Sequence, residues 1–501
     1  MTSITFYGGI NEIGGNKILL EHKNTRIFFD FGMSFNTYKK YFAEFLQPRK
    51  CNALFDFFEF GLLPKLNGIY RKDYCLHCSL EYPEKPFANA VLLSHAHIDH
   101  SSYIHFLRED IPIYCTKETF LILKALEETS IGSFTDYINL KKSFHFVKTK
   151  RQTYKRLDGE DSKISRKFVI VEPYKKYQLD EVEVQAVPVD HSLPGACAFV
   201  IYTDSGNLVY TGDFRFHGRK RELTRKFVKI AKRAKPEIML CEGTRIDETS
   251  NVTEEDVENK SKEIISSSNG LIVVNYPIRD LDRLVTFYNI AKDSNKDLVV
   301  NLKQAFLIEL FEKISNYPKL KEVSIYIDRK GWGLTSNEFY VFLEDVGWIK
   351  GSEVEQRHVE ADYKIWERRF LSLKNTVSYK EIRENPSNYI FRCDNFELNE
   401  LIDIKPEKGI YIRSMTEPFS EDMIIEENRV RNWLSHFNLS SIHQIHASGH
   451  AGGPEIEEII GKIEPERLVP IHTEKHELFK EYISDLGINI VVPIEGGKVE
   501  L

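Results

Sequence analysis

The chain of 501 residues is long enough for two or three domains, and its 42% hydrophobic and 29% charged residues are ordinary for a globular protein. Its formal net charge of −7 excludes a polycation, so any nucleic-acid binding needs a local basic patch. No run of about 18 apolar residues is present, which argues against a transmembrane helix and a membrane partner. The N-terminus lacks the order of a signal peptide, and seven irregularly spaced cysteines favour reduced thiols. We therefore expect a cytoplasmic protein.

Residues 1–35 alternate apolar and polar side chains around Gly-rich turns, which predicts two or three antiparallel strands. Residues 36–88 are aromatic and irregular, and we expect an insert whose rings belong to a core rather than to a base-stacking platform. This insert contains a C-x-x-C pair, Cys75 and Cys78. Because a structural zinc site usually needs a second pair of ligands, we interpret the two as thiols in a loop.

A dense group of potential metal ligands follows a short apolar run at residues 91–93, which predicts a buried strand. The group consists of His95, His97, Asp99 and His100. Imidazole and carboxylate side chains suit divalent zinc, which can keep one position open for water. Alternate residues of an extended segment point to the same side, so we expect the first two histidines to share one ion. After a turn, the aspartate and the last histidine would face a second ion.

Two basic runs follow. Residues 141–156 contain seven lysines and arginines, and most such runs are solvated faces. The second run begins after Asp213 and continues to Lys235. Its last part, residues 223–235, fits a basic helix facing water as well as a substrate surface. For its first part we expect contacts with a phosphodiester backbone, made by Arg215, His217 and Arg219.

From residue 244 the pattern changes to strands that alternate with helices, which predicts a parallel α/β unit. We expect helices over 252–268, 279–293, 304–315 and 421–437, and strands over 270–275, 297–301 and 409–414. Residues 320–400 are less regular. The C-terminal part contains a helix at 455–461 and a strand that ends in His472.

The segment HAHIDH after an apolar strand resembles the signature of the metallo-β-lactamase fold superfamily of metallohydrolases. His191 and Asp213, each at the end of an apolar stretch, match the third and fourth motifs of that superfamily. Asp30 in IFFDFG matches the first motif, whose aspartate supports the histidine turn from behind. The resemblance implies an α/β protein with the αββα sandwich of this fold.

The next matching histidine, His472, lies 259 residues after Asp213 (472 − 213 = 259), so a whole domain is expected in the gap. This resembles the β-CASP branch, in which an inserted α/β domain caps the active site. We expect the core to comprise 1–243 and 438–501, with the aromatic insert 36–88, and the β-CASP domain to comprise 244–437. The segments FYGGINEIGGN, SGHA and PIHTE resemble the ribonuclease J family.

This resemblance implies two divalent metal ions, with zinc expected from five imidazoles and manganese as the alternative. One ion would be bound by His95, His97 and His191, the other by Asp99, His100 and His472, with Asp213 as the bridge and Asp30 behind them.

The implied catalytic residues are Asp99, Glu242 and His450. His450 would protonate the leaving oxygen or stabilise the charged transition state, and Glu242 would orient it. The turn formed by Ser448 and Gly449 precedes a helix and offers backbone N–H groups to a phosphate.

The expected function is hydrolysis of RNA phosphodiester bonds by a dimetal-activated water, as a 5′-to-3′ exonuclease, an endonuclease or both, in RNA processing or decay. A DNA nuclease of the same branch is the alternative. A thioester or lactone hydrolase is disfavoured because small substrates need no capping domain, and a scaffold with a dead site because all seven ligand positions are filled. Residues 414–420 only loosely match the family's 5′-phosphate pocket. Because the sequence as far as Leu501 does not supply the extra C-terminal domain that many members of this family carry, we do not expect dimerisation through such a domain, and a homodimer is kept as an alternative.

Overall fold

The computed structural model describes residues 2–43, 45–141, 143–158, 164–314, 316–333, 339–344, 347–353, 356–418 and 421–501. The chain forms two compact units. Unit 1 contains residues 1–251 and 448–501, and unit 2 contains residues 252–447, so unit 2 is inserted into the sequence of unit 1. The bounds predicted for the inserted domain, 244–437, remain a prediction, and the compact unit begins at Val252 and ends at Ala447.

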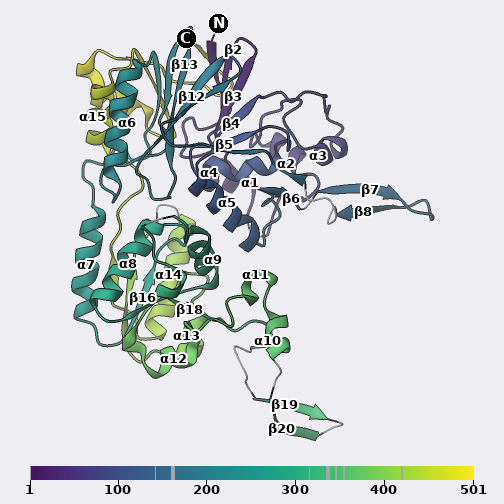
Figure 1. Ribbon diagram of the computed structural model, residues 1–501, viewed down its shortest axis with the longest axis vertical. Helices are drawn as coiled ribbons and strands as arrows, with labels where there is room; N and C mark the ends of the chain where they lie inside the picture. The colour runs from purple at the N-terminus through teal and green to yellow at the C-terminus, as the bar shows by residue number, and fades with distance from the viewer. Residues whose placement is uncertain are drawn as a thin grey trace. The chain divides into compact units, whose positions relative to one another are not determined.

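The first sheet of unit 1 is formed largely by the N-terminal quarter of the chain (Figure 1). Its strands, in spatial order, are β10 (Phe168–Ile170), β5 (Ile113–Cys115), β4 (Ala90–Leu92), β3 (Thr25–Phe29), β2 (Ile18–His22), β1 (Thr2–Phe6) and β27 (Lys498–Glu500). The antiparallel pairing of β1, β2 and β3 confirms the strands predicted within residues 1–35. Strands β3, β4, β5 and β10 are parallel to one another.

The second sheet of unit 1 begins with an antiparallel meander and ends with parallel strands. In spatial order it contains β11 (Lys176–Leu179), β12 (Val182–Pro188), β13 (Cys197–Thr203), β14 (Gly206–Tyr210), β15 (Ile238–Glu242), β25 (Arg467–Ile471) and β26 (Asn489–Ile490). Apolar side chains of the two sheets, such as Phe29 and Phe199, share one buried cluster, so the sheets face each other. Burial of this apolar surface is the main driving force for the sandwich.

Helices complete the layers of unit 1. The outer face of the second sheet packs against α6 (Arg221–Ala234), α15 (Gly453–Ile463) and α16 (His476–Ile483) in a second buried cluster. Figure 1 shows α1 (Phe35–Tyr41), α2 (Ala53–Glu59), α3 (Lys72–His77), α4 (Ile98–Ser101) and α5 (Lys117–Thr129) grouped beside β4 and β5. The arrangement of two sheets between helices is the predicted αββα sandwich.

The aromatic insert is more regular than predicted, because it contains the three short helices α1, α2 and α3. In α2 the residues Ala53, Leu54, Phe57 and Phe58 are buried, which is the spacing of one helical face. Helices of six or seven residues are too short for a clear periodic signal. The rings of Phe57 and Phe106 meet edge to face at 5.3 Å inside a core, whereas Phe55 is 47% exposed, so only part of the aromatic stretch belongs to a core.

Unit 2 is built on a parallel sheet, as its alternating pattern predicts. The strands in spatial order are β21 (Thr376–Val377), β18 (Ser324–Tyr326), β17 (Asp297–Val300), β22 (Tyr389–Arg392), β16 (Leu271–Asn275), β23 (Gly409–Arg413) and β24 (Ile442–Gln444). Its helices include α7 (Glu254–Ser266), α8 (Leu281–Asp293), α9 (Leu302–Phe311), α10 (Gln356–Asp362), α11 (Ile365–Arg368), α12 (Tyr379–Glu384), α13 (Glu400–Ile404) and α14 (Glu421–His436).

Local signals explain where these helices begin. Thr253 caps α7 and exchanges hydrogen bonds with Asp256 in a capping box. Asp280 and Asn301 cap α8 and α9 through their side-chain oxygens. Among the described residues, none of the helices is long and apolar enough to cross a membrane.

A buried carboxyl group in unit 2 predicts a pH dependence of stability. Burial raises the pKa of Glu400 to about 7, against a hydrogen bond of 2.6 Å from the Tyr326 hydroxyl. Because the folded state holds this proton more tightly than the unfolded state, the contribution of Glu400 to stability is lost as pH rises from about 4.5 to about 7. This rise in pH should lower the free energy of unfolding of the wild type by at most about 3 kcal/mol, and Glu400→Gln should abolish that decrease. Urea unfolding at pH 5 and pH 7 measures it, and an equal pH dependence in both proteins would contradict the assignment.

Candidate metal centre

Three parallel strands bring distant parts of the chain to one edge of the second sheet. Tyr210 in β14 pairs with Leu240 in β15, and Glu242 at the end of β15 pairs with Ile471 at the end of β25. The carboxyl ends of these strands therefore lie together. Gly243 and His472 directly follow β15 and β25, and Asp213 follows β14 after two intervening residues. This pairing explains how His472 approaches Asp213 across more than two hundred residues.

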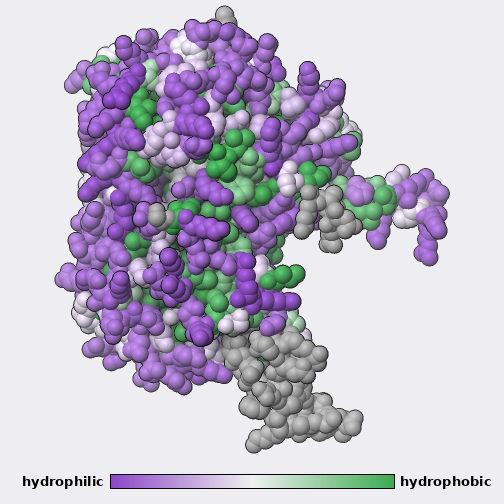
Figure 2. Space-filling model, in the orientation of Figure 1, coloured by the Kyte–Doolittle hydropathy of each residue, from purple (hydrophilic) through white to green (hydrophobic). Residues whose placement is uncertain are grey.

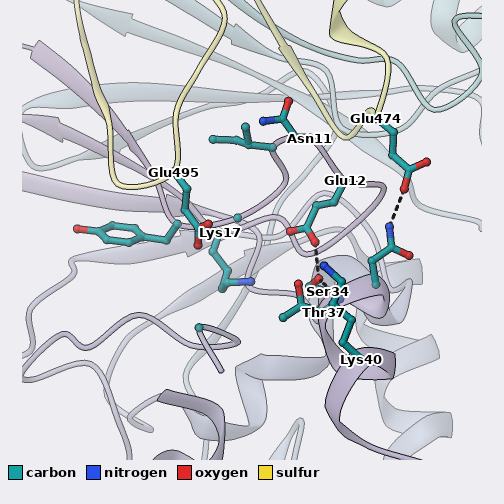
Figure 3. Close-up of a pocket in the computed structure, with 13 residues that line it drawn as sticks. Asn11, Glu12, Lys17, Ser34, Thr37, Lys40, Glu474 and Glu495 are labelled. Carbon is teal, nitrogen blue, oxygen red and sulfur yellow. Dashed lines mark hydrogen bonds between the residues drawn. The ribbon is translucent and has the colours of Figure 1, made fainter. Parts of the chain in front are cut away.

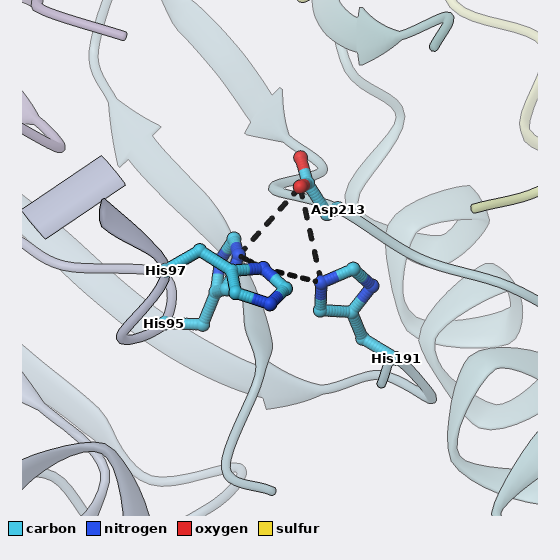
Figure 4. A group of neighbouring side chains, drawn as sticks. All are labelled: His95, His97, His191 and Asp213. Atoms are coloured by element: carbon cyan, nitrogen blue, oxygen red, sulfur yellow. Dashed lines mark hydrogen bonds and ion pairs between the residues drawn. The ribbon is translucent and has the colours of Figure 1, made fainter. Parts of the chain in front are cut away.

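The first group of ligands consists of His95, His97, His191 and Asp213 (Figure 4). The Nδ1 atom of His97 lies 2.9 Å from Nε2 of His95 and 3.0 Å from Nε2 of His191. The Oδ2 atom of Asp213 lies 3.6 Å and 3.9 Å from the latter two nitrogens. Four donor atoms at such separations could surround one tetrahedral ion.

The second group consists of Asp99, His100 and His472. The Nε2 atoms of the two histidines are 3.1 Å apart, and Oδ2 of Asp99 lies 3.2 Å from Nε2 of His472. Asp99 and His100 lie on the short helix α4, which begins directly after the loop that carries His95 and His97. All seven ligands predicted from the sequence are thus brought together in two groups.

Asp213 lies between the two groups. Its Oδ2 atom is 3.2 Å from Nε2 of His100 in the second group as well as 3.6 Å from Nε2 of His95 in the first. Its Oδ1 atom is buried and forms no hydrogen bond within the described part of the chain. A buried carboxylate oxygen without a partner is costly unless a cation neutralises it. The donor set therefore fits bound metal, with Asp213 able to serve both groups.

The outer nitrogens of several of these histidines are held by the surrounding fold. His191 donates Nδ1–H to the Gly449 carbonyl at 2.6 Å, and His100 donates Nδ1–H to the Asp30 carboxylate at 2.7 Å. The hydroxyl of Thr244 lies 2.8 Å from Nδ1 of His472. When Nδ1 carries the proton, the Nε2 lone pair is free and points at the group. Such outer contacts fix the tautomer and orientation of metal-binding histidines.

Asp30 is the centre of this support, as the resemblance implied. Its buried carboxylate accepts hydrogen bonds from the backbone and hydroxyl of Ser94 at 2.7 Å, and from the hydroxyl of Tyr210 at 2.5 Å. Because the Ser94 hydroxyl donates to Asp30, it can accept from Nδ1–H of His95, which lies 3.0 Å away. Asp30 therefore orients ligands of both groups. Ser94, Tyr210 and Thr244 were missed by the sequence analysis, although a tyrosine within the apolar run before Asp213 is a usable signal.

The protonation states of several ligands also suit metal binding. Burial lowers the pKa of His191 to about 4 and the pKa of His95 well below its usual value, so both rings are neutral at pH 7. Burial opposes ionisation of Asp213, but His100, His472 and His450 outweigh it and lower the pKa of Asp213. Neutral imidazole and ionised carboxylate are the forms that bind metal.

His450 and Glu242 form a pair beside the two groups. The Nδ1 atom of His450 lies 3.0 Å and 3.1 Å from the two carboxylate oxygens of Glu242, and 3.8 Å from Oδ2 of Asp213. Burial would lower the pKa of His450, but Glu242 and Asp213 outweigh it and raise the pKa to about 9. Glu242 also accepts the N–H groups of Phe214 and Thr244 at 3.1 Å, which fixes the carboxylate. These atoms form a third group that could hold a metal.

Two glycine-rich features allow the close approach of backbone to the ligands. Gly14 has φ +84°, and a Cβ atom there would lie 2.5 Å from Cβ of Asp99. Gly449 would bring a Cβ atom to 2.9 Å from Cε1 of His191. His472 itself adopts φ +51°, an uncommon conformation that is held by its N–H bond of 2.8 Å to the Gly9 carbonyl. The segment FYGGINEIGGN therefore supports the site through its backbone.

The residues predicted to contact substrate lie around the loop at Ser448. Arg215 is buried, and it donates to the Asp190 carboxylate at 3.2 Å and to the Ser448 carbonyl at 3.0 Å. His217 is also buried and donates Nε2–H to the same carbonyl at 3.0 Å. Arg219 and Ser448 are half-buried, and the Ser448 hydroxyl accepts the N–H of His450 at 3.2 Å. The recorded contacts of Arg215 and His217 hold this loop, and direct contact with substrate remains a prediction.

A polar pocket of about 530 Å³ adjoins the glycine-rich segment (Figure 3). Its walls include Glu12, Lys17 and Glu474, and α1 contributes Asn36, Thr37 and Lys40. The side chain of Lys17 is buried and donates to the carbonyls of Gly15 and Gly32 at 2.7 Å and 3.2 Å. None of the seven predicted metal ligands lines this pocket. The pocket therefore does not include the candidate metal centre.

The C-x-x-C pair lies in and directly after α3, in the aromatic insert. Cys75 and Cys78 are buried near α3, and burial raises the pKa of both thiols to about 11. Within the described ranges, neither belongs to a group of side chains that could hold a metal. The thiolate needed for zinc is disfavoured there.

Two family descriptions match the chain. Residues 81–252 match the β-lactamase superfamily domain, and residues 437–493 match the Zn-dependent metallo-hydrolase RNA specificity domain. The first match contains six of the seven predicted ligands, and the second contains His472 together with His450. The chain therefore has the metallo-β-lactamase fold, and these two segments resemble a metallo-hydrolase domain and an RNA specificity domain.

Similar proteins extend this match to most of the chain. Ribonuclease J of Mycoplasma pneumoniae is 23% identical over 97% of this chain and 71% of its own length. Ribonuclease J of Pyrococcus abyssi is 22% identical over all of this chain and 97% of its own length. A crystal structure of a protein of unknown function from Enterococcus faecalis V583 covers both chains completely, with a TM-score of 0.70 and 26% identity. The chain is ribonuclease J-like, and the predicted fold class and family resemblance are confirmed.

Asp30→Asn should weaken metal binding about 10- to 100-fold, because the amide cannot accept the four hydrogen bonds that orient His100 and Ser94. Titration with a chelator, followed by measurement of bound metal, gives the affinity. Asp204→Asn is the matched control, since the exposed Asp204 carboxylate contacts His22 rather than a predicted ligand. Wild-type metal affinity in folded Asp30→Asn protein would show that Asp30 does not support the site.

Proposed function

We propose that this chain is a metal-dependent ribonuclease of the ribonuclease J type, which hydrolyses RNA phosphodiester bonds in RNA processing or decay. The observation that carries the proposal is the convergence of two ligand groups on Asp213, with His450 and Glu242 beside them. The match to an RNA specificity domain and the similarity to ribonuclease J proteins support RNA as the substrate. We propose 5′-to-3′ exonuclease activity, endonuclease activity or both.

We propose two zinc ions, one in each ligand group. Five imidazole donors favour zinc over magnesium, and the matched description of a Zn-dependent metallo-hydrolase supports this choice. The first ion would be held by His95, His97 and His191, the second by Asp99, His100 and His472, with Asp213 between them. When bound, two such ions supply a water of lowered pKa and a clamp on the phosphate oxygens.

The protein's own groups then position the substrate and move a proton. Glu242 holds Nδ1–H of His450, which orients the ring beside Asp213. His450 would donate a proton to the leaving oxygen, or stabilise the charge that develops there. The turn at Ser448 and Gly449 would contact the phosphate. Arg215 and His217 hold the Ser448 carbonyl, and together with Arg219 they would contact the phosphodiester backbone. Asp99 would bind the second ion and would also take part in catalysis.

We further propose a cytoplasmic location, which seven free cysteines support. A homodimer remains a prediction, which light scattering would test. The predicted but loosely matched 5′-phosphate segment, residues 414–420, is described only as far as Pro418, since Phe419 and Ser420 lie outside the described residues.

The direct test uses labelled RNA with a 5′-monophosphate, RNA with a 5′-triphosphate, and single-stranded DNA, each with and without chelator. We expect cleavage of RNA that stops with chelator and returns with zinc. A preference for the 5′-monophosphate and release of mononucleotides would identify the 5′-to-3′ exonuclease. Cleavage of DNA alone would replace the proposal with the DNA nuclease, and activity that survives metal removal would refute both.

His450→Ala should retain both ions and lose turnover about 10²- to 10⁴-fold, because it removes a general acid without removing one of the seven proposed ligands. Bound zinc and the cleavage rate of RNA are measured on the same preparation. His476→Ala, at the beginning of α16, provides a control histidine outside the three groups. Loss of one ion from the His450 variant would instead make His450 a ligand with Glu242 and Asp213.

A further inference from the structure

A two-stranded hairpin in unit 1 takes no part in the metal centre. It is formed by β7 (Phe144–Lys148) and β8 (Tyr154–Asp158), with five paired positions. Hydrogen bonds between Thr149 and Thr153 close the turn. Figure 1 shows the hairpin extending away from the rest of unit 1, and in the described chain β7 and β8 form a sheet of their own.

The hairpin is strongly basic on an acidic chain. Residues 144–158 contain five lysines and arginines and a single acidic residue, Asp158 at the base, whereas the whole chain has a net charge of −7. Lys148, Lys150, Arg151 and Lys155 are exposed, and none forms an ion pair with a described residue. Lys142, at the start of the basic run, lies outside the described residues. The hairpin therefore carries a concentrated and solvated positive charge.

Helix α6 is a second basic element and offers a comparison. Its Arg225 pairs with Glu222, its Lys232 pairs with Glu464 at 3.1 Å, and Lys226 lies 3.4 Å above the ring of Tyr174. Several of the α6 cations are thus already engaged by the protein. By contrast, the cations at the tip of the hairpin form no comparable ion pair or cation–π contact within the described chain.

One face of the hairpin alternates aromatic rings with cations. Phe146 lies opposite Arg156, and Lys148 lies opposite Tyr154, so each of these two cross-strand pairs has one ring and one positive charge. The Tyr154 side chain is 71% exposed and that of Phe146 is 45% exposed. Figure 2 shows a hydrophobic band along this arm and a hydrophilic tip. Exposed rings beside lysine and arginine are the combination that binds single-stranded nucleic acid by stacking and charge.

The base of the hairpin is anchored. Phe144 is buried and packs edge to face against Tyr74 at 5.0 Å, and His77 stacks on Phe146 at 5.2 Å. Lysines on exposed edge strands can simply prevent aggregation. That role does not account for a largely exposed tyrosine, which would promote association. An anchored base and an exposed basic tip instead suit a binding arm.

We propose that this hairpin captures single-stranded RNA, with the cations on the phosphates and Tyr154 stacked on a base. The proposal rests on the proposed function, because it identifies the arm as a holding site for the substrate outside the metal centre. The ligand that these side chains would bind is a polyanion whose base faces are exposed. An anionic membrane offers charge without such faces.

The test compares two sets of substitutions in a His450→Ala background, so that the probe is not cleaved. The hairpin variant carries Lys148→Gln, Lys150→Gln, Arg151→Gln and Lys155→Gln. The matched control carries Arg225→Gln, Lys229→Gln, Lys232→Gln and Arg233→Gln on α6. The probe is a fluorescently labelled oligouridylate, and its affinity is measured across a salt series, with thermal unfolding to show that each variant folds.

We expect the hairpin variant to bind the RNA about 100-fold more weakly at low salt. The slope of log affinity against log salt should fall by about 3, since four charges are lost. Tyr154→Ala alone should weaken binding about fivefold or more. Wild-type RNA affinity in the hairpin variant, an equal loss in the α6 control, or no binding by the parent would overturn the proposal. Loss of binding to phosphatidylserine vesicles with RNA affinity unchanged would assign the arm to a membrane surface.

Failure of the proposed ribonuclease function would be seen separately. With His450 intact, the hairpin variant should hydrolyse bis(p-nitrophenyl) phosphate, a diester too small to need the arm, at the wild-type rate. If the hairpin variant binds RNA more weakly but the wild type cleaves no RNA, the binding arm is supported and the ribonuclease function is refuted. If the wild type cleaves RNA but the hairpin variant binds RNA as tightly as its parent, the ribonuclease function is supported and the binding arm is refuted.

Discussion

The parallel pairing of β15 with β25 is the constraint on which the candidate metal centre depends. It places Glu242 beside Ile471 and so brings His472 to Asp213 and His100. Without this pairing the second ligand group would keep only Asp99 and His100, which are too few to fix an ion. The insertion of unit 2 between these strands is tolerated because the two strands hydrogen bond to each other whatever the length of chain between them.

The second condition for the site is that its histidines arrive already oriented. Asp30, the Gly449 carbonyl and Thr244 each hold an outer ring nitrogen, so the inner nitrogens face the ligand groups before any ion binds. Such preparation reduces the entropy lost when the metal is bound. It also explains why a buried aspartate at the end of β3, with an uncommon φ of +54°, is kept in the fold.

Much of this arrangement could be predicted from the sequence because the ligands follow apolar strands in recognisable motifs. His95 to His100 form one dense signal, and Asp213 and His472 each follow shortly after an apolar strand. Their convergence could therefore be expected from the fold that the family resemblance implies. The helices of the aromatic insert could not be predicted, since six or seven residues give little periodicity. Nor could the surroundings of Arg215: charge alone does not reveal burial against Asp190, which depends on packing between distant segments.

The order of the ligands along the chain has a consequence for synthesis. A ribosome produces the first ligand group, from His95 to Asp213, long before it reaches His472. A nascent chain can therefore hold one cation while the second group is still incomplete. If both ions are needed for hydrolysis, the nascent protein cannot cleave the messenger RNA from which it is being translated until β25 has been made and has paired with β15.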